Sequence, residues 1–137
     1  MAEMNPEALD TFLRETRIAK LAYLQPSGAP TLVPVWFEWD GSVARVFTSR
    51  NSLKMKRLAA EPRVALGVEE AVGVPERWVT IEGTVAVSTD GVTALIERLA
   101  RRYYAPERAE EAISSWTKTP EMWVILTITP ERTRSSA

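Results

Sequence analysis

The side chains best suited to binding an anion lie in residues 47–63, FTSRNSLKMKRLAAEPR. Their pattern predicts a strand, a polar turn, and a helix over 53–60 with Ser52 as its N-cap. Helix N-termini carry free backbone N–H groups and partial positive charge, so cations in the first turns are locally unfavourable unless an anion such as phosphate binds there. The plainer interpretation is a solvated basic helix face. The candidate phosphate contacts are Thr48, Ser49, Arg50, Ser52, Lys54 and Lys56.

Two aromatic-rich segments are the next candidates for a binding surface. In residues 34–37, PVWF, Trp36 and Phe37 fall on opposite faces of a strand. One of them should enter the core and the other should face a neighbour or a ligand. In the segment WVTIEGTVAV, residues 78–87, Gly83 indicates a bulge, or a close approach by a ligand or another backbone.

The chain contains no cysteine and no histidine. These absences exclude disulfides, thiolate nucleophiles, sulfur zinc sites, histidine triads and the usual haem ligand, and we predict no metal site. With 17 basic and 18 acidic residues, the net charge of -1 argues against a dedicated nucleic-acid binder. Chemistry must then come from carboxylates, amines, hydroxyls, aromatics or a cofactor. By chemical type alone, Glu82, Tyr103 and Tyr104 are the acid–base candidates, and no catalytic residue is assigned.

The elements that must position these residues follow from periodicity and turn signals. Asn5 and Pro6 predict the start of a short helix. Strands are predicted near 18–24, over 31–39 with Pro34 at an edge or bulge, and over 43–48 after the Asp40-Gly41 hairpin. Further strands are predicted over 63–69, 77–88 and 122–129, with Pro130 ending the last one and a frayed tail after Glu131. Helical spacing returns at 92–99, and another helix follows Pro106.

Six strands with mostly short connections indicate an antiparallel barrel rather than a sheet built with crossover helices. The fold class that we predict is mainly β with added helices, a six-stranded antiparallel split β-barrel. At 137 residues the chain fits a single domain, 1–137. No secretory or membrane-spanning segment is apparent, and we expect a cytoplasmic protein with no membrane partner.

Three stretches resemble one known family: PVWFEWDG, RVFTSRNSLKMKRLAAEPRVAL and WVTIEGTVAV. Their order resembles the flavin-binding split-barrel family related to pyridoxamine 5'-phosphate oxidase. The small oxidoreductases of that family that use FMN or the deazaflavin coenzyme F-420 are the most similar branch. The resemblance extends from about Ala19 to Pro130. Its most specific part is Phe47-Thr48, then Ser52-Leu53-Lys54, then Pro62-Arg63-Val64.

The resemblance implies roles for particular residues. Thr48 and Lys54 would hold the cofactor phosphate, and the strand that includes Val35, Trp36 and Phe37 would line the flavin ring with its backbone. Trp78 is a further candidate cofactor contact. Members of the family are typically homodimers with two cofactor sites at the subunit interface, so the resemblance also implies self-association.

The chain departs from the vitamin-synthesising oxidases of the family at two points. Those enzymes have arginine directly before the phosphate lysine, where this chain has Leu53. They also carry a C-terminal Arg–x–His element that grips the substrate, which a chain without histidine lacks. True oxidation of pyridoxamine phosphate is therefore not expected, and histidine-dependent haem handling is disfavoured for the same reason.

The function predicted on this basis is an oxidoreductase that moves a hydride between FMN or coenzyme F-420 and a small substrate. The cationic residues around Lys54 favour the deazaflavin slightly, because its anionic tail needs an extended basic groove. One alternative is a non-catalytic flavin carrier or sensor. An oligonucleotide-binding barrel is the weakest alternative, because no basic groove interleaved with aromatics is evident.

Overall fold

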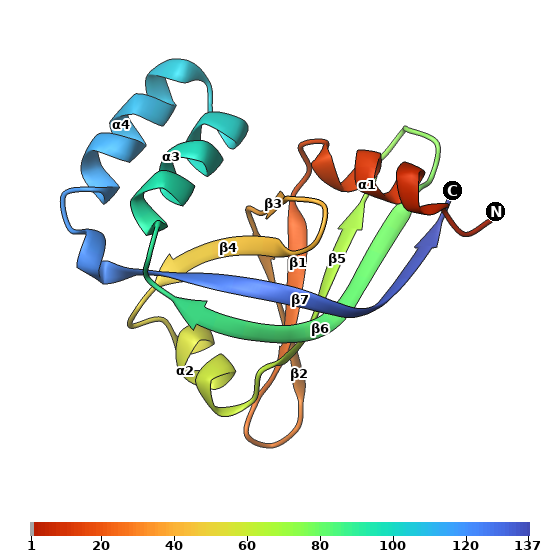
Figure 1. Ribbon diagram of the computed structural model, residues 1–137, viewed down its shortest axis with the longest axis horizontal. Helices are drawn as coiled ribbons and strands as arrows, with labels where there is room; N and C mark the ends of the chain where they lie inside the picture. Colours follow the sequence, from red (N-terminus) through yellow and green to blue (C-terminus); the bar gives the residue numbers. More distant parts are fainter. Residues whose placement is uncertain (1) are drawn as a thin grey trace.

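The computed structural model of the protein describes residues 2–137. A curled antiparallel sheet of seven strands forms its body, and helices lie at its ends and against one opening (Figure 1). The elements are α1 (Pro6–Arg14), β1 (Ala19–Leu24), β2 (Pro30–Val35), β3 (Glu38–Trp39), β4 (Ala44–Ser49), α2 (Leu53–Ala60), β5 (Arg63–Glu69), β6 (Trp78–Ser88), α3 (Val92–Tyr103), α4 (Pro106–Trp116), a 3-10 turn (Pro120–Met122) and β7 (Trp123–Ser136).

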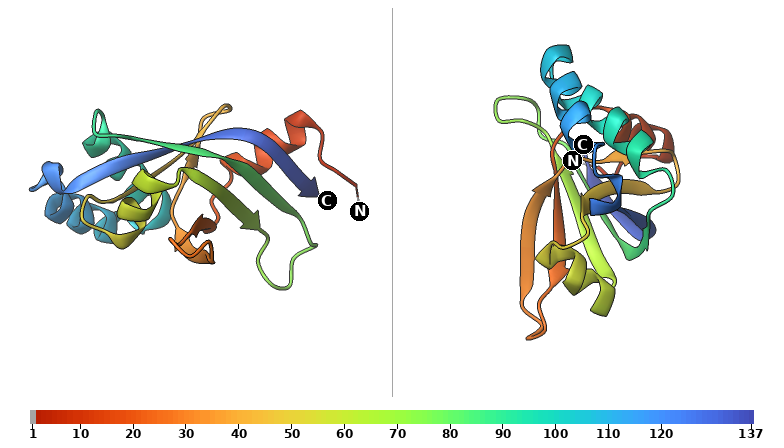
Figure 2. Two further views of the ribbon diagram at one scale, coloured as in Figure 1. Left: turned by 90° about the horizontal axis from the view of Figure 1, so that it is seen from below. Right: turned by 90° about the vertical axis from the view of Figure 1, so that its left-hand side faces the viewer.

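The order of the strands is β2-β1-β5-β6-β7-β4-β3. Strands β2 and β3 follow one another in the chain but lie at opposite edges, joined by Trp36 and Phe37. The sheet therefore curls into a split barrel, as Figure 2 shows from two further directions. The predicted fold class is confirmed, but the count of six strands was wrong. The segment 31–39 is two strands, because the chain leaves β1 after Val35 and crosses to pair with β4.

Several local predictions are confirmed. Pro34 lies on the edge strand β2, where its missing N–H costs little. Helix α2 spans 53–60 as predicted, and the Ser52 Oγ accepts a hydrogen bond from the Met55 N–H at 3.0 Å. Asn5 caps α1 in the same way, with its Oδ1 2.8 Å from the Ala8 nitrogen.

The predicted end of the last strand was wrong. Strand β7 continues through Pro130 to Ser136 and pairs with β6 from Ile125 to Ser136, so the tail is not frayed. The register shifts between Glu82 and Gly83: Pro130 pairs with Gly83, Arg132 pairs with Glu82, and the extra residue between them is Glu131 on β7. A proline at a bulge need not interrupt the ladder, because the extra residue is unpaired there. The bulge predicted at Gly83 is thus confirmed, and the approaching backbone is that of Thr129.

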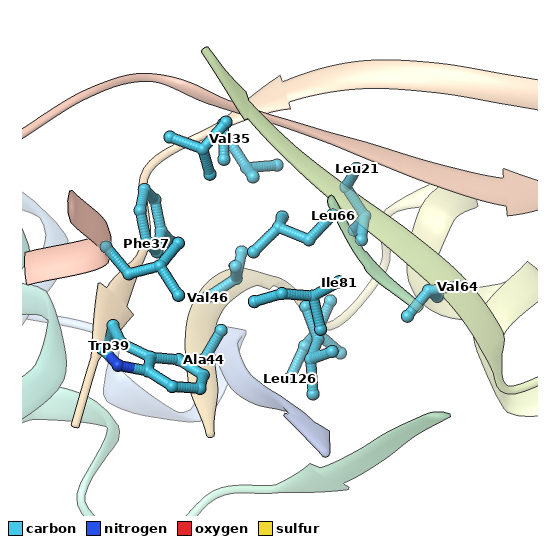
Figure 3. Close-up of a cluster of buried hydrophobic side chains, with 14 of the residues drawn as sticks. Leu21, Val35, Phe37, Trp39, Ala44, Val46, Val64, Leu66, Ile81 and Leu126 are labelled. Atoms are coloured by element: carbon cyan, nitrogen blue, oxygen red, sulfur yellow. The ribbon is translucent and has the colours of Figure 1, made fainter. Parts of the chain in front are cut away.

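The interior of the curled sheet is the main hydrophobic core. Side chains from both halves of the sheet meet there, and Figure 3 shows them converging. The labelled members are Leu21, Val35, Phe37, Trp39, Ala44, Val46, Val64, Leu66, Ile81 and Leu126. The prediction that one residue of the Trp36–Phe37 pair enters the core is confirmed, because Phe37 is fully buried and Trp36 is only half-buried.

Helices α3 and α4 pack side by side next to the end of the sheet formed by β4 and β7 (Figure 1). Leu95, Ile96 and Leu99 of α3 bury one face against Ile125 of β7. Ala100, Ala109 and Ile113 join the two helices to each other. Among residues 2–137, no helix has both the length and the apolar character needed to cross a membrane.

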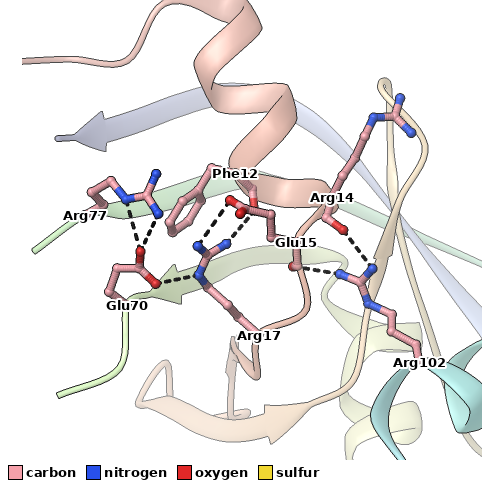
Figure 4. Close-up of polar contacts among 7 residues, drawn as sticks. All are labelled: Phe12, Arg14, Glu15, Arg17, Glu70, Arg77 and Arg102. Carbon is pink, nitrogen blue, oxygen red and sulfur yellow. Dashed lines mark hydrogen bonds and ion pairs between the residues drawn. The ribbon is translucent and has the colours of Figure 1, made fainter. Parts of the chain in front are cut away.

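A charged cluster fastens α1 to the β5–β6 connection (Figure 4). The Glu70 carboxylate accepts hydrogen bonds from Arg17 Nε at 2.8 Å and Arg77 Nε at 3.0 Å. The Arg17 guanidinium also lies over the ring of Phe12, 3.8 Å from its centroid. Hydrogen bonds from Arg17 and then Arg77 lower the pKa of Glu70 to about 2.

Glu70→Gln should weaken the dependence of stability on acidic pH. The folded-state pKa lies below the ordinary value of 4.5, so the Glu70 contribution is complete above pH 4.5 and is lost as the pH falls toward 2. Thermal midpoints of wild type and variant, measured between pH 2 and 6, should converge at the acid end. Asp40, whose pKa is lowered to about 2 chiefly by the Val43 N–H, provides an independent second contribution. Equal differences between wild type and Glu70→Gln at pH 2 and pH 6 would contradict the prediction.

Candidate functional site

A cavity of about 470 Å³ lies where the split in the barrel meets the α3–α4 pair. Segments far apart in the chain contribute to it: the start of β1, the end of β2, strand β4, and helices α2 to α4. Its lining residues are Ile18, Pro34, Val35, Trp36, Phe47, Lys54, Tyr104 and Trp116. Its volume falls in the usual range for small-molecule sites, roughly 300–1,000 Å³.

Trp36 is the centre of the aromatic wall of this cavity. The Tyr104 ring packs edge-on against it with 4.7 Å between centroids, and the Phe47 ring packs edge-on at 6.4 Å. Trp116 lies 6.0 Å from Trp36 and 5.9 Å from Phe47. The wall therefore presents flat, apolar faces suited to a planar ligand.

The phosphate turn predicted from the sequence lies at one end of the cavity. Thr48 is buried, with 7% of its surface exposed, and its Oγ1 lies 3.3 Å from the Ser52 Oγ. No acidic residue lies in the first turn of α2, where acids normally offset the positive end of a helix. These hydroxyls and the start of the helix form a polar corner that adjoins the cavity at Phe47 and Lys54, although neither hydroxyl lines the cavity itself.

Among residues 2–137, Lys54 is the one charged residue that lines the cavity. It is half-buried, and within residues 2–137 its ammonium has no ion-pair or hydrogen-bond partner. Burial lowers the pKa of Lys54 below its ordinary value. A desolvated cation without a carboxylate beside it is unfavourable unless an anion joins it.

The structure does not bring all of the predicted phosphate contacts to this corner. Arg50 is exposed and its Nε donates to the Glu121 carbonyl at 2.9 Å, in a different groove. Ser49 accepts a hydrogen bond from the Asn51 N–H. Lys56 is exposed on α2 and does not line the cavity.

The remaining predicted cofactor contacts do not all lie at this cavity either. Val35 and Trp36 line the cavity, whereas the Phe37 side chain is in the core and its N–H donates to the Tyr103 hydroxyl. Trp78 lies in another groove, of about 320 Å³, on the sheet surface formed by β1, β5 and β6.

Two of the three acid–base candidates are already engaged. Glu82 pairs with Arg134 at 3.0 Å, away from the cavity. The Tyr103 hydroxyl donates to the Arg17 carbonyl at 2.6 Å. Tyr104 lines the cavity, and its hydroxyl has no hydrogen-bond partner in the described part of the chain. Tyr104 is therefore the one candidate proton donor of the three that is placed against the cavity.

Ile18 and Trp116 line the cavity although no sequence pattern marked them as site residues. Trp116 continues the apolar face of α4 that includes Ala109 and Ile113. That periodicity shows which face is buried, but it does not show that the face meets Trp36 from the β2–β3 crossing.

The family model described as pyridoxamine 5'-phosphate oxidase matches residues 6–136. A solved structure called "F-420 reductase" is 25% identical, with a TM-score of 0.73, over 90% of this chain and 94% of that chain. A conserved hypothetical protein of Mycobacterium tuberculosis is also 25% identical, with a TM-score of 0.75, over 96% and 84% of the two chains.

The FAD and heme binding protein of Mycobacterium smegmatis is 21% identical over 96% of this chain and 70% of its own, with a TM-score of 0.74, and supports the fold alone. The search of curated proteins found no match. Because the family model covers nearly the whole described chain and the curled sheet agrees with it, this protein belongs to the pyridoxamine 5'-phosphate oxidase family and has its flavin-binding split-barrel fold.

Proposed function

We propose that the protein is an oxidoreductase that holds the phosphate of a flavin-type cofactor at Lys54 and the ring system against Trp36. The observation that carries this proposal is the half-buried Lys54 ammonium, which lines the cavity without an anionic partner among residues 2–137. A cofactor phosphate supplies the missing negative charge. When bound, the cofactor supplies hydride chemistry, which explains how a chain without cysteine or histidine can catalyse a redox reaction.

The donors available in the polar corner fit a phosphate group. Thr48 and Ser52 share one hydrogen bond, and Ser52 also accepts from the Met55 N–H. One hydroxyl proton therefore remains to be donated, together with the three N–H bonds of the Lys54 ammonium. The positive end of α2 adds to the attraction.

The deazaflavin coenzyme F-420 is the cofactor that we propose first, with FMN as the alternative. The 25% identity with the structure called "F-420 reductase" supports this order. Fewer cations are free to bind the anionic tail of coenzyme F-420 than the sequence suggested. Arg50 is hydrogen-bonded to the Glu121 carbonyl, and Arg57 is hydrogen-bonded to the Gln25 side chain. Lys56 remains exposed beside the corner and available to an anionic tail. Side-by-side titration with both cofactors tests the order, and Lys56→Ala should weaken only the binding of the deazaflavin.

Tyr104→Phe should lower turnover by roughly a hundredfold, the smaller end of the range for removing a general acid. Hydride delivery to a carbonyl-conjugated or quinone substrate must be completed by a proton, and the free Tyr104 hydroxyl can donate it. Cofactor affinity should change little, since the ring stays in place. Tyr23→Phe is the matched control, because the Tyr23 hydroxyl is away from the cavity and has no hydrogen bond to another residue of 2–137. Equal turnover in both variants would remove Tyr104 from the reaction.

We also propose that the protein is a homodimer in which the groove at Trp78 meets the partner. Small residues flatten the floor of this groove at Ala22, Ala65 and Gly67, and Leu32 at its rim is 60% exposed. An apolar surface of this kind is typical of an interface. One chain has a mass of 15.3 kDa, and light scattering at micromolar concentration should give twice that mass.

Turnover distinguishes an enzyme from a carrier or sensor. The protein loaded with reduced cofactor should be oxidised by at least one compound in a panel of quinones, enones and tetrapyrroles. Saturable cofactor binding with no oxidation across the panel would instead support the carrier.

A further inference from the structure

We propose that Tyr103 is a positioning residue whose single hydroxyl holds two walls of the cofactor cavity in place. The expected effect on cofactor binding rests on the proposed function, whereas the contacts of Tyr103 are present in the protein without a cofactor. Tyr103 does not line the cavity. It acts through three residues that do: Ile18, Trp36 and Tyr104.

The hydroxyl of Tyr103 is bound between two backbone segments that are distant in sequence. It donates to the Arg17 carbonyl at 2.6 Å, and the Phe37 N–H donates to it at 3.3 Å. The Arg17 carbonyl belongs to the peptide group that leads into Ile18. The Phe37 N–H belongs to the peptide group that follows Trp36. One oxygen atom therefore fixes the peptides next to both wall residues.

The hydrogen bond from the Phe37 N–H to Tyr103 matters because this backbone segment lies outside the sheet. Trp36 and Phe37 lie between β2 and β3, where neither strand ladder includes them. Backbone outside a ladder depends on other partners to keep its position. Tyr103 supplies such a partner at the point where the chain crosses from one edge of the sheet to the other.

The ring of Tyr103 restrains the Trp36 side chain as well. The two rings are stacked, with centroids 5.1 Å apart and an interplanar angle of 4°. Tyr104, the next residue, packs edge-on against the same indole. The last residues of α3 thus hold the aromatic wall from two directions.

The end of α3 is itself anchored, so it can serve as a support. Arg102 donates to the Arg14 carbonyl at 2.9 Å and to the Glu15 carbonyl at 2.8 Å, which satisfies acceptors at the C-terminal end of α1 (Figure 4). Arg17, in turn, is held by Glu70. The support for the cavity wall is therefore continuous from α1 through Tyr103 to Trp36.

Tyr103→Phe tests the proposal because it removes only the hydroxyl and keeps the ring stack. In the cofactor-free protein, amide hydrogen exchange at Phe37, whose N–H donates to the removed oxygen, should become about fivefold faster, the factor that corresponds to one ordinary hydrogen bond. Exchange in the interior of α3 should keep its wild-type rate. The dissociation constant of the cofactor should rise by no more than this factor, because the affinity falls only as far as the fraction of the protein with an ordered wall falls.

Ile128→Val is the matched control for stability, since Ile128 is fully buried on β7 and does not line the cavity. It should lower global stability without selectively faster exchange at Phe37 and without weakening cofactor binding. If Tyr103→Phe behaves like Ile128→Val in both measurements, Tyr103 has only a general structural role and the inference is wrong. If the wild type binds neither cofactor, the proposed function fails, and the exchange data alone decide whether Tyr103 positions the wall.

Discussion

Lys54→Met should weaken cofactor binding by ten- to a hundredfold and leave the stability of the cofactor-free protein unchanged or raised. A hydrogen bond to a charged group is worth roughly 1.5–3 kcal/mol, which corresponds to that range of affinity. Methionine keeps most of the apolar stem of lysine but removes the ammonium that is desolvated beside the positive end of α2. Isothermal titration and thermal unfolding of the same preparations measure both effects.

The pH dependence of binding provides a second test of the same residue. Burial places the pKa of Lys54 below its ordinary value of 10.5, and a bound phosphate would raise it again. Cofactor affinity should therefore fall as the pH rises through the Lys54 pKa, with proton uptake on binding. Lys54→Met should lose this part of the pH dependence.

Lys118→Ala is the control for charge removal, because Lys118 is exposed and does not line the cavity. It should bind the cofactor as the wild type does at every pH. Equal affinities in the Lys54 and Lys118 variants would place the phosphate elsewhere.

Gly83→Ala should destabilise the fold by about 3 kcal/mol or more, a severe effect for one methyl group. A Cβ at this position would lie 2.1 Å from the Thr129 carbonyl oxygen and 3.3 Å from the Pro130 Cα. These are backbone atoms of the neighbouring strand, so they cannot move aside as the end of a side chain would. The thermal midpoint should fall by roughly 10 °C.

Gly67→Ala is the matched control on the neighbouring strand β5. A Cβ there would have nothing within 4 Å. The same substitution should therefore be tolerated within the chain, with a change in thermal midpoint far smaller than that of Gly83→Ala, and light scattering of both variants separates this effect from any change at the proposed dimer interface, which includes Gly67. Similar losses in both variants would show that glycine-to-alanine replacement in this sheet acts through something other than the bulge.

Local signals in the sequence accounted for much of the fold and for the polar half of the site. Ser52 followed by a helical pattern predicted α2 and its cap, because the capping bond joins atoms only three residues apart. The alternation of side chains along a strand predicted that Trp36 and Phe37 point in opposite directions, with one of them in the core. It did not reveal that the strand is interrupted at these two residues, because the interruption depends on β3 pairing with β4 at the far edge of the sheet.

The aromatic half of the site depends on contacts between distant segments. Trp116 and Trp36 are 80 positions apart in the numbering and meet only because α3 and α4 pack beside β4 and β7. Arg50 illustrates the opposite error, since its place in the turn suggested a phosphate ligand, whereas the structure directs it to the Glu121 carbonyl. The continuation of β7 past Pro130 was hidden for a similar reason, because the bulge beside this proline is defined by how β7 pairs with β6.

The most direct test of the central claim is a crystal structure of the protein grown with FMN or coenzyme F-420. The account predicts the cofactor phosphate within hydrogen-bond distance of the Lys54 Nζ and of a hydroxyl of Thr48 or Ser52, with the ring system beside Trp36. A phosphate bound at another surface, with Lys54 still lacking an anionic partner, would contradict it.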